Sequence, residues 1–267
     1  MPPTDLIKLV SIYYSRQNAT LGPILISLGE LIKTKDIDGD KLETVCRKQK
    51  QLSQVTDMIH AAHVFHRCVK EENPAKTKTS LPTIMSLLVG DYLLAQSSVD
   101  MADLRYPKTV DLVARGLEDY AHGEFLKLKL FECCDTKLSS GKLSKGLAEY
   151  ARLTCGSLLS NACLSTALLA GYRAAQSKDA KDLSNIVYWF GQSTGSAQRL
   201  IELIYQPDMN SETDNEIIST IDKATIDNYI NEHLDRSKSL LLSLPDGDQR
   251  PVLLKTLENM RSNCSTN

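Results

Sequence analysis

The sequence predicts an all-α protein that folds as a single large helical bundle. Apolar residues recur at the three- and four-residue spacing of one helix face along nearly all of the 267 residues, and strand-like alternation is nowhere sustained. Apolar residues make up 42% of the chain, which is enough to bury a continuous core. The breaks between helical stretches are shorter than a domain linker, so residues 1–267 are expected to form one domain.

The expected helices follow one another along the whole sequence. They cover about 6–13, 24–32, 40–68, 82–97, 107–130, 143–176, 182–205, 215–244 and 250–263. Pro107 begins one of them, in agreement with the preference of proline for the first helical turn. The breaks carry turn-forming residues, and they fall at 71–79, 139–141, 207–214 and 245–248.

Charge and composition exclude several classes of partner. The chain has 31 basic and 33 acidic side chains and a net charge of −2, so it offers no basic surface for a nucleic acid or a charged membrane. The longest apolar stretches, such as 158–172, are interrupted by serine and asparagine, so no transmembrane segment is expected.

Cysteine usage and the first residues bear on the compartment. Seven cysteines is an odd number, and the adjacent Cys133 and Cys134 are poorly placed to bridge one another, so we expect free thiols in a reducing compartment. The first residues show neither a secretory leader nor an organelle presequence. Taken alone, these patterns favour the cytoplasm.

Three histidines are the only pattern that suggests a metal. His60, His63 and His66 are spaced by three, so successive pairs are neighbours on a helix. Because no cluster of cysteines or carboxylates supplies further ligands, we interpret them as core or rim histidines and expect no bound metal or other cofactor.

Two carboxylates lie on otherwise apolar lines. Asp91 follows the line of Leu87 and Leu88, and Glu124 follows that of Tyr120. A buried carboxylate needs a partner, so both are expected to be structural carboxylates with hydrogen-bond partners. No catalytic residue is assigned, since no nucleophile elbow, zinc-protease motif or nucleotide-binding glycine motif is present.

Five segments follow one another in a recognisable order: Met58 to His66, Val89 to Ala95, Gly123 to Leu126, Phe190 to Ala197, and Leu240 to Pro245. Taken in that order, they resemble landmarks of the trans-prenyl diphosphate synthase family. The resemblance extends over nearly the whole chain and implies the all-α bundle of that family. It leaves open whether N-terminal helices of the family are missing here.

The residues that carry the chemistry of that family have changed. Its first aspartate-rich motif corresponds to Arg67, Cys68, Val69, Lys70 and Glu71, and its second corresponds to Glu202, Leu203, Ile204, Tyr205 and Gln206. Each degenerate motif keeps one carboxylate. The charged residues of the first sum to about +1 where three aspartates would give about −3, so a divalent cation would be repelled. Most of the basic residues that would hold diphosphate are also replaced.

This pattern most resembles the second, non-catalytic subunits of heteromeric long-chain synthases. The resemblance implies a catalytic polyprenyl diphosphate synthase subunit as partner, magnesium held by that partner, an isoprenoid diphosphate in the shared complex, a mitochondrial location and a role in making the ubiquinone side chain. It also implies an interface on the helices at 82–97 and 107–130, for which the candidate residues are Leu88, Tyr92 and Leu93. Two alternatives stay open, a weakly active prenyltransferase using Glu71 and Glu202, and an interaction or lipid-binding protein.

Overall fold

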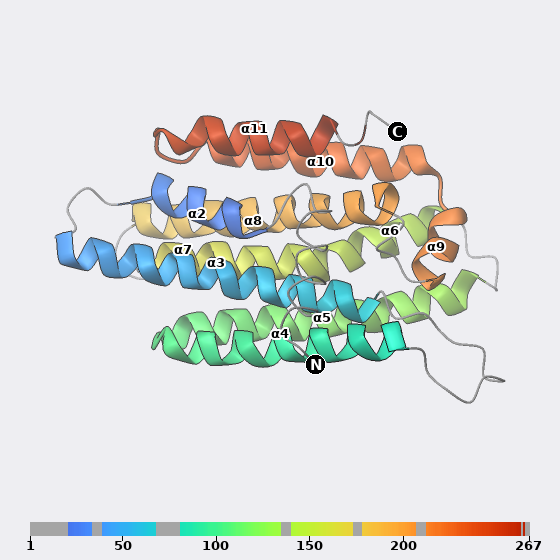
Figure 1. The fold of residues 1–267 in the computed structure, drawn as a ribbon. Coiled ribbons are helices and arrows are strands. Elements are labelled where there is room, and N and C mark those ends of the chain that lie inside the picture. The colour runs from blue at the N-terminus through green and yellow to red at the C-terminus, as the bar shows by residue number, and fades with distance from the viewer. Residues whose placement is uncertain are drawn as a thin grey trace.

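The computed structural model describes residues 21–33, 39–67, 81–134, 140–172, 178–206, 212–262 and 264. These residues are helical almost throughout and include no strand, which confirms the all-α prediction (Figure 1). The helices are α2 (Leu21–Leu31), α3 (Gly39–Arg67), α4 (Leu81–Asp103), α5 (Pro107–Cys134), α6 (Ser140–Ala151), the π-helical turn η1 (Arg152–Gly156), α7 (Ser157–Leu169), α8 (Lys178–Tyr205), α9 (Glu212–Ser219), α10 (Lys223–Leu242) and α11 (Gln249–Ser262).

The helices are stacked in layers whose long axes run roughly alongside one another. Figure 1 shows α10 and α11 on one side of the bundle and α4 and α5 on the other, with α2, α3, α7 and α8 between them. α3 packs along α4, while α8 packs along both α7 and α10. The middle helices therefore have neighbours on both sides.

Several boundaries differ from those predicted. α4 continues to Asp103, six residues beyond the expected end, and α6 already begins at Ser140, inside an expected break. The expected helix at 215–244 is two helices, because the Asp222 carboxylate accepts hydrogen bonds from the backbone of Ala224 and Thr225 and so starts α10 anew. The expected segment at 6–13 and the break at 71–79 lie outside the described residues.

α7 lies at the centre of the bundle and is buried on nearly all sides. Leu158, Leu159, Ala162 and Cys163 join the main hydrophobic core, which draws on every layer. Several polar side chains of α7 bond within their own helix, as when the Thr166 hydroxyl donates to the Ala162 carbonyl oxygen, while Ser157 donates to Asp119 on α5. These bonds satisfy most of the polar groups that the burial of α7 takes out of water.

Glycines let α8 approach the preceding helical segment at backbone distance. A Cβ added at Gly195 would lie 2.2 Å from the carbonyl oxygen of Cys155, and one at Gly191 would lie 2.7 Å from that of Leu159. Cys155 belongs to η1, where one extra residue widens the turn. The close approach brings η1 and α8 together at the level of the polar groups described below.

Candidate functional site

The two degenerate motifs meet inside the bundle. Arg67 is the last residue of α3, and Glu202 lies in the last turn of α8. Their side chains are 5% and 3% exposed, and the Arg67 Nη2 atom lies 3.7 Å from Glu202 Oε2. Arg67 also donates a hydrogen bond of 2.7 Å to the Tyr120 hydroxyl on α5. An ion pair thus occupies the place where the family resemblance implied a metal site.

Both oxygens of Glu202 have partners. His60 Nε2 lies 2.9 Å from Oε1, and Gln198 donates to the same atom at 3.0 Å. Arg199 donates to Oε2 at 3.4 Å. Burial would raise the pKa of this carboxyl, but His60 and the two arginines together hold it well below its ordinary value. Glu202 is therefore a buried, ionised counter-ion.

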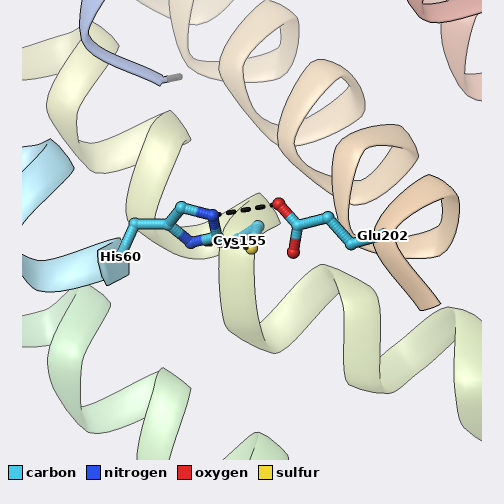
Figure 2. A group of neighbouring side chains, drawn as sticks. All are labelled: His60, Cys155 and Glu202. Carbon is cyan, nitrogen blue, oxygen red and sulfur yellow. Dashed lines mark hydrogen bonds and ion pairs between the residues drawn. The ribbon is translucent and has the colours of Figure 1, made fainter. Parts of the chain in front are cut away.

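Figure 2 shows His60, Cys155 and Glu202 grouped together, with the contact between His60 and Glu202 drawn as a dashed line. The Nδ1 atom of His60 lies 3.5 Å from the Cys155 sulfur, and its Nε2 atom faces Glu202. Burial would lower the pKa of His60, but the acidic groups on either side raise it to about 10. The three side chains come from α3, η1 and α8, so the contact ties three elements together.

This cluster does not fit a metal ion. His60, Cys155 and Glu202 are of the types that bind zinc, and their ligand atoms lie within 4.8 Å of one another. A divalent ion bound to Glu202 would, however, lie close to the guanidinium groups of Arg67 and Arg199. The positive charge beside Glu202 therefore opposes a divalent ion at this cluster.

A second layer of ion pairs extends the network toward α9. Arg199 donates to the Tyr150 hydroxyl at 2.8 Å, and Tyr150 donates to Glu124 at 2.9 Å. Lys127 then pairs with both Glu124 at 2.9 Å and Asp214 at 3.3 Å. Glu124 thus has the partners that a structural carboxylate requires. Lys127, Arg67 and Arg199 hold its pKa below the ordinary value, although burial would raise it.

Within the described part of the chain, the network pairs three carboxylates with three permanent cations and with His60, whose raised pKa adds a further positive charge. Its carboxylates are Glu124, Glu202 and Asp214, and its permanent cations are Arg67, Lys127 and Arg199. Buried charges are tolerated when they are paired in this way. Each of these acidic groups therefore has a basic partner within the network.

The three histidines do not converge on a common point. His60 faces Glu202, whereas the ring of His63 stacks on that of Tyr120 with centroids 3.6 Å apart. His66 instead lies against α4, where its Nε2 atom is 3.2 Å from Asp91. Each histidine has its own packing partner, in agreement with their interpretation as core or rim residues.

The prediction that Asp91 is a buried carboxylate is wrong. Its side chain is 71% exposed, so it does not face the core. The periodicity was misleading because α4 is apolar on more than one side, and Asp91 belongs to the outer one. Its carboxylate is next to His66, while Leu88 and Tyr92 on the same outer side are 57% and 52% exposed.

One of the three candidate interface residues is also misplaced. Leu93 is only 7% exposed and packs with residues of α3 and α4 in a small separate cluster of Ala61, Ala62, Val64, Phe65, Val89 and Leu93. It lies on the opposite side of α4 from Leu88. Leu93 is therefore a core residue, and only Leu88 and Tyr92 are available to a partner.

The other predicted site residues are placed as follows. Cys68 and Glu71 lie outside the described residues. Gln206 follows the end of α8, and its backbone N–H donates to the Glu202 carbonyl oxygen at 3.1 Å, so it extends the helical pattern. Tyr150 and Arg199, which bond to Glu124 and Glu202, are not among the predicted site residues. The three-residue spacing of Arg199 and Glu202 was the available signal.

Known structures with the same fold come from polyprenyl synthases. A decaprenyl diphosphate synthase from Rhodobacter capsulatus aligns over 96% of this chain and 88% of its own, with a TM-score of 0.66 and 17% identity. A polyprenyl synthase from Caulobacter crescentus, complexed with calcium and isoprenyl diphosphate, aligns over 100% and 90% with a TM-score of 0.64 and 18% identity. The fold is that of the isoprenoid synthases.

Sequence relatives agree with the fold. Decaprenyl-diphosphate synthase of Dictyostelium discoideum is 27% identical over 205 residues, which cover 74% of this chain and 39% of that protein. Solanesyl-diphosphate synthase 1, mitochondrial, of Oryza sativa subsp. japonica is 30% identical over 61% of this chain and 35% of its own length. The chain is thus similar in sequence to long-chain trans-prenyl diphosphate synthases and shares their fold.

Two further observations complete the comparison. The chain matches only about two fifths or less of the length of these relatives, and no family model matches the sequence. Among the described helices, none has both the length and the apolar character needed to cross a membrane.

Proposed function

We propose that this chain is the non-catalytic or regulatory subunit of a heteromeric trans-polyprenyl diphosphate synthase that makes the ubiquinone side chain, most like subunit two of decaprenyl diphosphate synthase. The observation that carries the proposal is the burial of Arg67 against Glu202. Where an active site would present carboxylates to magnesium, these residues neutralise one another. The chain keeps the fold and has lost the metal-binding chemistry.

The relatives support both the pathway and the subunit role. They carry the names of decaprenyl, solanesyl and hexaprenyl synthases, and one of them is decaprenyl-diphosphate synthase subunit 1 of Schizosaccharomyces pombe, 28% identical over 52% of this chain and 39% of its own length. A protein named as subunit 1 implies a second kind of chain. Several relatives are named as mitochondrial, which supports a mitochondrial site of action.

The partner would be the catalytic subunit, which would hold the magnesium and the isoprenoid diphosphate. The outer side of α4 supports such a contact, because it exposes a row of apolar side chains that is unusual for a free surface. We call this row the α4 face, and it consists of Ile84, Leu87, Leu88, Tyr92 and Val99. Phe125 and Leu128 on α5 are 62% and 50% exposed and extend the apolar surface in the second helix of the expected interface.

Reconstitution tests the proposal. The chain is co-expressed and co-purified with the catalytic polyprenyl synthase subunit of the same organism, and prenyl transfer is assayed for each chain and for the pair. The expected result is a stable complex, full activity of the pair, and no magnesium-dependent transfer by this chain alone. Turnover by the isolated chain at a rate comparable to that of the pair would instead establish a transferase in its own right, and failure to bind any synthase subunit would remove the subunit role.

A further inference from the structure

One charged side chain, that of Asp91, lies among the apolar residues of the α4 face. Between residues 81 and 99 the only ionisable charge is Asp91. It lies one helical turn from Leu87, Leu88 and Ala95, all three exposed on the same side, so the carboxylate is surrounded by apolar neighbours along the helix. At 71% exposure it is hydrated in the free chain.

Covering this face with a partner would remove water from the carboxylate. An ionised group that is buried without a partner costs several kcal/mol, so an apolar interface is normally depleted of charge at its centre. Asp91 would therefore oppose docking unless another group approached it. The structure already supplies one from within the same chain.

That group is His66, near the end of α3. Its Nε2 atom lies 3.2 Å from the Asp91 carboxylate, without the alignment of a hydrogen bond. The imidazole packs against Gly90, the residue that precedes Asp91 on α4, because a Cβ added at Gly90 would collide with His66 Nε2. Glycine at position 90 therefore makes room for the ring beside Asp91, and a larger residue there would displace it.

We infer that His66 is a positioning residue whose imidazole pairs with Asp91 and so makes the α4 face able to dock on the catalytic subunit. This inference rests on the proposed function. The occupant we propose is the catalytic subunit, a synthase-fold chain that would meet the α4 face through apolar side chains. A second copy of this chain is a poorer occupant, because a symmetric contact through α4 would bring two Asp91 carboxylates to the same patch.

A mutant cycle tests the pair in the purified two-subunit complex. The variants are His66→Asn, Asp91→Asn and the double substitution, and the dissociation constant of the complex is measured for each. His66→Asn should weaken the complex by at least about tenfold, because the carboxylate is then buried unpaired. Asp91→Asn should have little effect, and the double variant should recover nearly the original affinity, since no charge is left to neutralise.

Two readouts separate docking from folding and from the proposed function. The thermal midpoint of each isolated variant should match that of the original chain, and Asp235→Asn, which breaks an exposed ion pair with Arg261 on the other side of the bundle, should leave affinity unchanged. Equal affinity of His66→Asn and the original chain overturns the inference. Weakening by Asp91→Asn alone overturns it too, because the partner would then supply a cation. If the original chain does not bind the catalytic subunit, the proposed function itself fails.

Discussion

Arg67 and Glu202 hold one another in the interior of the bundle, 3.7 Å apart and almost fully buried. They occupy the two positions that resemble the aspartate-rich motifs of the prenyl synthases. The contact pairs two opposite charges inside the bundle. Charges that would otherwise repel one another inside the bundle are balanced by side chains of the chain itself.

The Arg67→Met substitution should destabilise the chain by about 2 to 3 kcal/mol, because the buried Tyr120 hydroxyl loses its hydrogen-bond partner and Glu202 loses one of its basic neighbours. Chemical unfolding measures the loss. The matched control is Arg261→Met, whose partner Asp235 is exposed, and there we expect about 1 kcal/mol or less. Equal losses in both variants would show that the interior pair has no special role.

Glu124→Ala should lower the free energy of unfolding by about 1 to 3 kcal/mol, since Tyr150 and Lys127 would lose their shared acceptor. Asp91→Ala should change it by only about 0.5 kcal/mol or less, because its side chain is exposed. Thermal unfolding of the two isolated variants distinguishes these carboxylates. A large loss for Asp91 would contradict its placement on the outer side of α4.

Gly195→Ala should destabilise the bundle severely, by about 3 kcal/mol or more, because the added carbon would collide with the backbone of η1. Gly141→Ala is the control, since nothing lies within 4 Å of its Cβ position in α6. That change should be neutral or stabilising by up to about 1 kcal/mol. Circular dichroism during heating compares the two variants, and similar midpoints would argue against the tight packing of α8 on η1.

Tyr92→Asp should dissociate the proposed complex and leave the isolated chain folded, because Tyr92 is half-exposed on the α4 face. Val252→Asp, equally exposed on α11, is the control and should leave the complex intact. Leu93→Asp should instead disrupt the packing of α3 on α4 and destabilise the isolated chain, since Leu93 is buried. Size-exclusion chromatography of the pair separates these outcomes, and persistence of the complex with Tyr92→Asp would place the contact elsewhere.

Stability should have its maximum near pH 6 to 7, roughly the ordinary histidine pKa. Burial and Arg67 lower the pKa of His63 from 6.5 to about 3, so its contribution is present above about pH 6.5 and is lost on acidification. The pKa of His60 is raised to about 10 despite burial, so its contribution is complete below about pH 6.5 and is lost as the pH rises toward 10.

Thermal midpoints measured from about pH 5 to 9 check both limbs of this profile. His63→Phe keeps a ring against Tyr120 and should flatten the acidic limb, while His60→Asn should flatten the alkaline one. An unchanged acidic limb in His63→Phe would assign that loss of stability to other groups.

The sequence by itself determined the helical class and most of the helix positions, and through its resemblance to the prenyl synthases it predicted the loss of metal-binding aspartates. These depend on local spacing and on residue identity, which are read directly along the chain. It also indicated that α4 is apolar on more than one side. Spacing did not predict the exact helix boundaries, as at Asp222, where a single side chain starts a new helix.

The tertiary structure decided which groups meet and which side of a helix is buried. His60 and Glu202 are 142 residues apart in sequence, and no local pattern pairs them. Leu88 and Leu93 are the same residue type on the same helix, yet one is exposed and the other is buried, because α3 covers only one side of α4. Burial depends on neighbouring elements, and periodicity along one helix cannot specify where those neighbours lie.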